Sequence, residues 1–291
     1  MSWNANAKVT LLAGWLLGVG MSSRARPAEE TTLIEKVKGS VRSQVVGHRG
    51  LAKSAPENTL SNMRTCLELR VSIELDVRRA RDGQLVILHD ATLDRTSNGK
   101  GKVADFTLAE LKKLDAGSWF DPAFKGEPIP TLEEVFALRA KYPPESGMIA
   151  VDLKVADTEG DIVRLAQKHG VLDRLVFIGR AITDAEVRRT TRKTDPKAHV
   201  ARLATSSEEI GAALADADAD WIYVRYFPSR EDVARVHAAG KRFFMSGPKV
   251  TGLEYENWRQ ATDLGLDLIL TDHPLELGKM VRTGVGAEPS K

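Results

Sequence analysis

GMIAVDLKVADTEGDIVRLAQKHGVLDRLVFIG, residues 147–179, contains one complete strand-helix-strand unit. Two short apolar runs, MIAV and LVFI, flank a stretch whose apolar residues recur at helical spacing. This alternation predicts parallel strand pairing, because a crossover helix must return the chain to the end of the sheet where the first strand began. The first run ends in Asp152 and Lys154, so polar side chains stand at the carboxyl end of the predicted strand.

The same alternation extends over most of the chain. Nine short apolar runs, most of them separated by helix candidates, lie at residues 44–48, 72–77, 84–89, 147–153, 174–179, 198–204, 220–226, 241–246 and 267–272. So many runs predict an α/β fold of the (β/α)8 TIM barrel type, because an open doubly wound sheet seldom uses as many strands. Nine runs for eight barrel strands leave one run over, and the link from Val77 to Gln84 is too short for a helical crossover.

A small insertion is expected after the third strand. Residues from about 91 to 130 are rich in Gly, Pro and aromatic side chains and show little periodicity. We interpret them as a segment that lies over the barrel mouth. The barrel itself is expected over residues 40–282, followed by a polar tail at 283–291.

Length and composition fit one large globular domain, either an enzyme or a binding protein. The chain has 291 residues, and barrels of this type use roughly 250. Lys and Arg number 42 against 40 for Asp and Glu, a net charge of +2, so no overall field favours nucleic acid and we expect no nucleic-acid partner. The single cysteine, Cys66, excludes an internal disulfide and a cysteine-based zinc cluster, and its amphipathic surroundings predict a buried thiol in a helix.

The N-terminal segment carries an export-like pattern. An apolar run of 13 residues, Val9–Met21, follows Lys8 and is short for a membrane span, which needs about 20 residues. We expect residues 1–28 to be a signal peptide that sends the protein to the periplasm or cell exterior. Because Lys8 is the only basic residue before the run and two arginines lie near the cleavage region, an uncleaved anchor with membrane association is the alternative.

Polar side chains follow four of the apolar runs directly. The carboxyl ends of barrel strands meet at one mouth, so we expect these side chains to converge there. They are His48 and Arg49 after the first run, Glu74 and Asp76 within the second, His89 and Asp90 after the third, and Asp152 and Lys154 after the fourth.

The carboxylates predict a divalent metal site. Glu74 and Asp76 stand two apart on a strand, so both side chains leave the same face and are spaced to chelate one ion. Oxygen ligands of this kind suit Mg²⁺ or Ca²⁺, and Asp152 could add a third carboxylate. Two such carboxylates side by side repel each other unless a cation neutralises them. For this pair alone, a surface strand of alternating charge is the alternative.

Two histidines at separate strand ends indicate acid-base catalysis. Imidazole titrates near neutral pH, so one of His48 and His89 can take a proton from an attacking oxygen while the other donates one to a departing alkoxide. Arg49 and Lys154 supply positive charge for an anionic phosphoryl group. These parts together predict cleavage of a phosphate ester in a small-molecule substrate.

The region from Gly47 to Val103 resembles the signature region of the glycerophosphodiester phosphodiesterase family. The family's four marker motifs occur here in order, as HRG at 48–50, PENT at 56–59, ELD at 74–76 and HD at 89–90. The resemblance implies metal-dependent hydrolysis of glycerophosphodiesters to glycerol phosphate and an alcohol. It implies these roles: His48 and His89 as the acid-base pair, Glu74 and Asp76 as metal ligands, Arg49 as a phosphate contact, and Glu57, Asn58 and Asp90 as supporting residues. Glu57 either hydrogen-bonds the site from behind or caps the helix that follows.

The resemblance continues more faintly to about residue 280. Asp152-Leu153-Lys154 stands where the family usually has Glu-x-Lys, which retracts the carboxylate by one methylene. Thr271–Pro274 resembles a strand end of the family, either as a simple turn or as part of the site. Two segments that would line the alcohol side of the pocket, around Gly179 and at Phe243–Gly247, depart from the family.

Because the pocket segments depart from the family, we consider two arginines as substrate contacts and two alternative functions. Arg180 or Arg225 could bind an anionic head group, or each could be an ordinary solvated side chain. One rival function is phospholipase D-like cleavage of lysolipids or sphingolipids, which an apolar mouth built from Trp119, Phe120, Phe124 and Phe243 would favour. The other is a noncatalytic phosphodiester-binding barrel. The sequence leaves open the attacking group, water or a neighbouring substrate hydroxyl, as well as the native metal and the oligomeric state.

Overall fold

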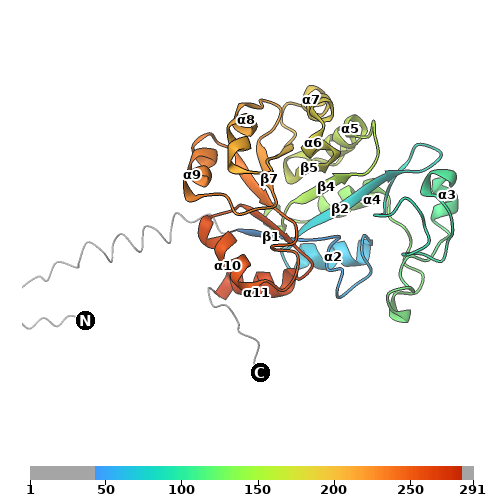
Figure 1. The fold of residues 1–291 in the computed structure, drawn as a ribbon. Coiled ribbons are helices and arrows are strands. Elements are labelled where there is room, and N and C mark those ends of the chain that lie inside the picture. Colours follow the sequence, from blue (N-terminus) through green and yellow to red (C-terminus); the bar gives the residue numbers. More distant parts are fainter. Residues whose placement is uncertain (1–42, 284–291) are drawn as a thin grey trace, which may run out of the picture. The chain divides into compact units, whose positions relative to one another are not determined.

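Residues 43–283 are described by the computed structural model, and they form a barrel of parallel strands surrounded by helices (Figure 1). Its strands follow the order β5-β4-β2-β1-β9-β8-β7-β6, and a parallel bridge between Phe177 and Val200 joins the two ends. The strands are β1 (Gln44–Gly47), β2 (Ser72–Arg79), β4 (Ile149–Leu153), β5 (Leu175–Gly179), β6 (Ala201–Leu203), β7 (Trp221–Val224), β8 (Arg242–Met245) and β9 (Leu268–Thr271). The predicted (β/α)8 barrel is therefore confirmed.

The helices cover the outside of the barrel. They are α2 (Leu60–Glu68), α4 (Leu132–Arg139), α5 (Glu159–His169), α6 (Arg180–Thr183), α7 (Ala185–Thr194), α8 (Ile210–Ala215), α9 (Arg230–Ala238), α10 (Tyr255–Leu264) and α11 (Pro274–Thr283). Cys66 lies buried in α2, as its surroundings predict. The last helix, α11, begins with Pro274, a residue that fits the first turn of a helix because its missing N–H needs no partner there.

The surplus apolar run, at residues 84–89, is not a barrel strand. β3 (Leu85–Ile87) pairs antiparallel with the end of β2, with Arg79 opposite Leu85. Antiparallel neighbours need only a tight turn, here with Gly83 at φ 85°, so no crossover helix is required between them. The short link after Val77 therefore belongs to a hairpin, and eight strands are left for the barrel.

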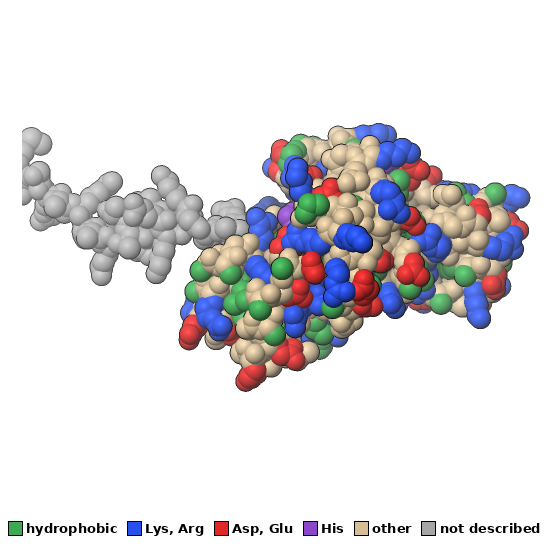
Figure 2. Space-filling model, turned by 90° about the horizontal axis from the view of Figure 1, so that it is seen from above, with side chains coloured by type: hydrophobic (Ala, Val, Ile, Leu, Met, Phe, Trp, Pro, Cys, Tyr) green, Lys and Arg blue, Asp and Glu red, His purple; other side chains and the backbone are tan. Residues whose placement is uncertain are grey.

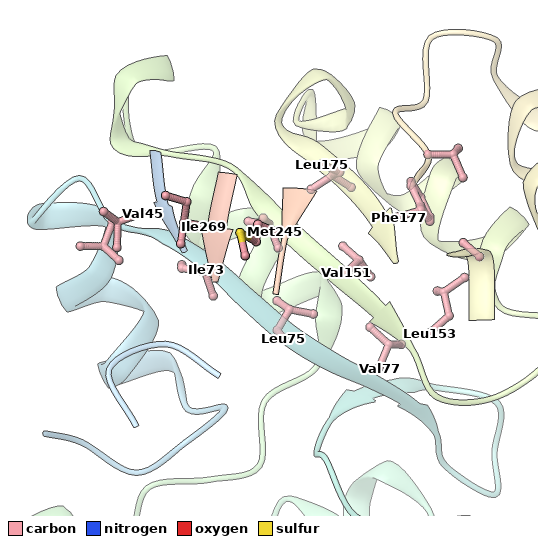
Figure 3. Packing of buried hydrophobic residues seen from close by; sticks show 14 of the residues in the cluster. Val45, Ile73, Leu75, Val77, Val151, Leu153, Leu175, Phe177, Met245 and Ile269 are labelled. Carbon is pink, nitrogen blue, oxygen red and sulfur yellow. The ribbon is translucent and has the colours of Figure 1, made fainter. Parts of the chain in front are cut away.

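Side chains along each strand alternate between the barrel interior and the helix layer. Ile73, Leu75 and Val77 of β2 point outward into the main hydrophobic core (Figure 3). Glu74 and Asp76 consequently face the interior. A second apolar cluster fills the interior below them, with Val46, Ala150, Val176, Phe244, Leu268 and Leu270 among its members.

The insertion follows β3 and has a small core of its own. It contains the short helices η1 (Val103–Asp105), α3 (Leu108–Leu111) and η2 (Pro122–Phe124), and it lies to one side of the barrel (Figure 1). Its buried residues, including Leu93, Val103, Leu111 and Ile129, pack on Ala80, Val86 and Leu88. Short turns of helix around a compact cluster explain why this stretch shows little periodicity in sequence.

Charged residues of both signs are interspersed over the face seen in Figure 2, in keeping with a net charge of +2. None of the helices within residues 43–283 is long and apolar enough to cross a membrane. The predicted signal peptide or anchor at 1–28 and most of the polar tail at 283–291 lie outside the described residues.

Candidate active site

Three carboxylates from two neighbouring strands meet at the carboxyl ends of the barrel. Asp76 of β2 lies opposite Asp152 of β4 in the parallel register, and Glu74 precedes Asp76 on the same face. Ligand oxygens of Glu74, Asp76 and Asp152 all lie within 4.8 Å of one another. Glu74 is 2% exposed and Asp76 is fully buried. The strand register thus brings together the three carboxylates that the sequence predicts as metal ligands.

Their electrostatics show an excess of negative charge. Burial, reinforced by Asp76 and Asp152, raises the pKa of Glu74 well above its ordinary value. Burial also raises the pKa of Asp152. Burial opposes ionisation of Asp76 as well, but the Lys154 ammonium and the Asn58 amide outweigh it and lower the pKa of Asp76. Lys154 Nζ lies 2.9 Å from Asp76 Oδ1 and 2.7 Å from Asp152 Oδ2, and Arg49 Nε lies 3.7 Å from Asp76 Oδ2, so two cations face three carboxylates.

This donor set fits a hard divalent cation. It consists of carboxylate oxygens alone, which are the ligands that Mg²⁺ and Ca²⁺ prefer. Asp76 Oδ1 is buried and pairs with Lys154 but lacks a well-oriented hydrogen bond. Between residues 43 and 283, no other group of three or more His, Cys, Asp or Glu side chains converges in this way. We therefore take Glu74, Asp76 and Asp152 as a candidate metal centre.

His48 is held by a carboxylate at the end of the last strand. Its backbone N–H donates to Thr271 O at 3.0 Å, which ties the end of β1 to β9. Its Nδ1 lies 2.7 Å from Asp272 Oδ1, and this hydrogen bond is the main reason that the pKa of Asp272 is lowered. An ionised carboxylate can only accept, so Nδ1 carries the proton and Nε2 is left for a substrate.

His89 is held in the same way by its neighbour. His89 Nδ1 lies 2.7 Å from Asp90 Oδ1, and Arg78 Nε donates to the His89 carbonyl at 2.9 Å. Hydrogen bonds from Arg95 and from His89 lower the pKa of Asp90. The side chains of His48 and His89 are 30% and 33% exposed, so both rings are open to a ligand.

Arg49 links the turn after β1 to the carboxylate cluster. Gly47 and Gly50 make this turn tight, because a Cβ on Gly47 would come within 2.4 Å of the Gly50 carbonyl oxygen. Arg49 has φ 57°, and its backbone N–H donates to Glu74 Oε2 at 2.9 Å. Its Nη1 donates to Glu57 Oε1 at 3.0 Å.

The PENT motif supports the site from behind. Asn58, at φ 59°, donates from Nδ2 to Asp76 Oδ2 at 2.8 Å. Thr59 is the N-cap of α2 and accepts from Asn62 N. Glu57 does not cap the helix but pairs with Arg49 and Arg95, which decides between the two roles considered for it.

The role of Asp272 is open in the sequence, because Thr271–Pro274 fits a simple turn as well as a part of the site; its hydrogen bond with His48 now places it beside the site. Arg95 is not among the predicted site residues. Arg95 lies inside the insertion, where no periodic signal marks its position.

The predicted aromatic mouth is wrong for Phe243. Phe243 lies in the helix-facing core of β8 and is fully buried, because the alternation along the strand turns Phe244 inward instead. Trp119, Phe120 and Phe124 stack edge to face within the insertion, with both ring pairs 5.7 Å apart. The four aromatic residues therefore do not form one apolar surface.

Fold and site together define a (β/α)8 barrel with a two-histidine, three-carboxylate centre at the carboxyl ends of its strands. The model of the glycerophosphoryl diester phosphodiesterase family matches residues 48–276, and this chain belongs to that family. The resemblance drawn from the four motifs is thereby confirmed.

Curated relatives share the family but are matched only in part. A glycerophosphodiester phosphodiesterase of Caldanaerobacter subterraneus is 54% identical over 99 residues, which are 34% of this chain and 41% of that protein. A glycerophosphodiester phosphodiesterase of Bacillus subtilis is 35% identical over 191 residues, 60% of this chain and 63% of that protein.

Solved structures match over more of their length. A glycerophosphodiester phosphodiesterase from Agrobacterium tumefaciens superposes with a TM-score of 0.67 at 26% identity, covering 80% of this chain and 97% of that one. A phosphodiesterase from Oleispira antarctica, solved in complex with the product sn-glycerol-3-phosphate, gives 0.69 at 25% identity, covering 82% and 97%.

Proposed function

We propose that this chain is a metal-dependent phosphodiesterase that hydrolyses glycerophosphodiesters to glycerol phosphate and an alcohol. One observation carries the proposal: His48 and His89 are each held through Nδ1 by a carboxylate, beside the cluster of Glu74, Asp76 and Asp152. The activity named for the curated relatives and the glycerol phosphate in the Oleispira antarctica structure support the substrate class.

The two histidines act as general base and general acid. With Nδ1 committed to a carboxylate, each ring presents Nε2, which accepts a proton when neutral and donates one when charged. One ring takes the proton from the attacking oxygen as the phosphorus–oxygen bond forms, and the other gives a proton to the departing alkoxide. Attack by water and attack by a neighbouring substrate hydroxyl, through a cyclic phosphate, both fit this arrangement.

The charged residues hold the phosphodiester. Arg49 and Lys154 offer positive charge to the anionic phosphoryl oxygens. A divalent cation held by Glu74, Asp76 and Asp152, Mg²⁺ or Ca²⁺, would supply Lewis-acid polarisation of the phosphoryl group. Asn58 and the Arg49 backbone N–H hold two of these carboxylates in place.

A matrix of metals and substrates tests the proposal. Purified protein should cleave glycerophosphocholine, EDTA should abolish turnover, and one of Mg²⁺ or Ca²⁺ should restore it. His48→Ala and His89→Ala should each lower kcat by at least about a hundredfold. His169→Ala is the matched control, because His169 pairs with Glu133 at the end of α5, away from the strand ends.

The rival functions are outcomes of the same matrix. Preferential turnover of lysolipids or sphingolipids over deacylated diesters would assign the phospholipase D-like activity. Binding of diesters without turnover under any divalent metal would make the chain a noncatalytic barrel. Full activity in the double variant His48→Ala/His89→Ala would contradict the mechanism.

We also propose that residues 1–28 export the protein, with an uncleaved anchor as the alternative. The short apolar run Val9–Met21 supports an export signal. Cell fractionation followed by N-terminal sequencing distinguishes the two, because a mature N-terminus near residue 28 requires cleavage. A cytosolic protein that keeps Met1 would contradict both.

A further inference from the structure

Arg225 continues the inward-facing row of β7 toward the barrel mouth. Trp221 and Tyr223 belong to the interior cluster, whereas Ile222 and Val224 pack in the helix-facing core. Side chains alternate along a strand, so the position of Arg225, directly after β7, shares the side of Tyr223. The Arg225 guanidinium lies over the Tyr223 ring, 5.7 Å from its centroid. Arg225 therefore extends the interior face at the end where the active site lies.

β7 stands opposite the strand that carries the carboxylates. In the order β5-β4-β2-β1-β9-β8-β7-β6, closed into a ring, β7 is four strands from β2 in either direction. Tyr223 is 6% exposed and interacts with Ser246 and Arg225. Burial raises the pKa of Tyr223, and Glu74 contributes to the increase across the interior.

The charge of Arg225 is uncompensated. Its side chain is exposed, and no carboxylate of residues 43–283 lies within ion-pair distance of it. Arg180, the other arginine considered from sequence, pairs with Asp184 at 3.3 Å. Gly247 after β8 packs closely against the stem of Arg225, because a Cβ there would lie only 3.2 Å from Arg225 Cγ. The two arginines therefore differ: Arg180 is paired with a carboxylate, whereas the Arg225 guanidinium is available to an anionic ligand.

Resting on the proposed function, we propose that Arg225 binds an anionic group on the alcohol portion of the substrate. With the scissile phosphate held on the side of Glu74 and Asp76, the alcohol extends across the mouth toward β7. The Tyr223 ring supports one face of the guanidinium and leaves its edge open. That edge binds a carboxylate or phosphate through two parallel hydrogen bonds. The favoured substrates are then glycerophosphodiesters whose alcohol carries a carboxylate or a second phosphate.

The test compares diesters that differ in the charge of the alcohol. The values of kcat/KM are measured for glycerophosphocholine, for glycerophosphoglycerol and for glycerophosphoglycerol phosphate, whose alcohol carries a second phosphate. In Arg225→Gln the ratio of the anionic to the choline substrate should fall about tenfold or more, mainly through a higher KM. Arg225→Lys should restore part of the ratio, because the point charge is kept. Arg180→Gln, the matched control, should leave the ratio unchanged.

Two results would overturn the proposal. An unchanged ratio in Arg225→Gln would show that the arginine does not contact the alcohol portion. An equal loss for all three diesters would assign Arg225 to the scissile phosphate or to the fold.

Binding separates this proposal from the proposed function. Calorimetric titration of the three diesters into the double variant His48→Ala/His89→Ala should give tighter binding of the anionic diester, and adding Arg225→Gln should remove that preference. Equal or undetectable binding of all three overturns the role of Arg225. Selective binding by Arg225, together with no turnover by the wild-type protein, contradicts only the proposed function.

Discussion

Arg95 donates two hydrogen bonds to Asp90, from Nε to Oδ2 at 2.7 Å and from Nη2 to Oδ1 at 3.2 Å. The other edge of the same guanidinium donates to both oxygens of Glu57, at 2.7 and 2.8 Å. Asp90 in turn orients His89, and Glu57 binds Arg49. One arginine of the insertion therefore joins Asp90, which holds His89, to the turn that carries Arg49.

Arg95→Ala should lower kcat by about ten- to a hundredfold, the usual effect of removing a group that orients a functional side chain. Asp90 would keep its contact with His89 but lose the support that fixes its position. Arg95→Lys should recover little, because an ammonium cannot bridge two carboxylates with four hydrogen bonds. Steady-state kinetics over a pH range would check this. Arg81→Ala removes an exposed ion pair with Glu110 near the insertion and should leave kcat unchanged; equal losses in both variants would contradict the role of Arg95.

Asp272→Asn should lower kcat by about a hundredfold and change its pH dependence. The amide can turn its N–H toward His48, which would force Nδ1 to accept and move the proton to Nε2. A ring with Nε2 protonated cannot take a proton from an attacking oxygen at that nitrogen. The measurement is the pH profile of kcat, with a melting curve to verify the fold. A variant with wild-type kcat at every pH would show that Asp272 only closes the turn after β9.

Glu74→Gln should weaken metal binding but raise the free energy of unfolding of the metal-free protein. The amide removes one charged ligand, so affinity for Mg²⁺ or Ca²⁺ should fall at least about tenfold. In EDTA the variant should be more stable than the wild-type protein by about 1 kcal/mol or more, because a buried carboxylate beside Asp76 and Asp152 is replaced by a neutral group of the same shape. Metal titration and urea unfolding with and without EDTA measure both effects. A loss of stability in EDTA would mean that the three carboxylates do not repel one another.

The alternation of apolar runs and helices predicts the barrel, and the polar residues at strand ends predict most of the site. This works because parallel strands end at a common mouth and side chains alternate along each strand. Glu74, Asp76 and Asp152 could therefore be placed together without a structure. β3 could not be assigned, because an apolar run of this length looks the same in a hairpin and in a barrel strand.

Residues that act through long-range contacts escape such patterns. Arg95 reaches Glu57 from a loop without periodicity, and only the folded insertion brings the two together. The phospholipase D-like alternative places Phe243 at the mouth, but neighbouring strand residues point to opposite faces, and Phe243 lies in the helix layer.

Cys66 should react with iodoacetamide far more slowly in the folded protein than in urea. Burial raises the pKa of this thiol to about 12, against an unfolded value near 8.5. The folded state therefore keeps the proton that the unfolded chain releases, so this group lowers the free energy of unfolding as pH rises above about 8.5. At pH 8.5 the alkylation rate, followed by mass spectrometry, should be about a thousandfold lower in the folded protein than in urea. The smaller thiolate fraction of the folded state alone accounts for this difference. Similar rates with and without urea would show that α2 opens readily.

Gly179→Ala should weaken metal binding although Gly179 is no ligand itself. The residue ends β5 with φ 69°, and a Cβ there would lie 2.0 Å from Asp152 Oδ1, so Asp152 would have to leave its position beside Asp76. We expect metal affinity to fall at least about tenfold, together with a loss of stability of more than about 1 kcal/mol, because φ 69° with ψ −122° disfavours alanine and the added Cβ would also lie 2.5 Å from Leu153 N. Gly170→Ala provides the control, because Gly170 has φ 65° and no atom within 4 Å of the added Cβ. Its left-handed backbone should cost about 1 kcal/mol of stability without any loss of metal affinity. Calorimetric metal titration and urea unfolding on both variants separate the two effects, and equal metal affinities would exclude a role for Gly179 in placing Asp152.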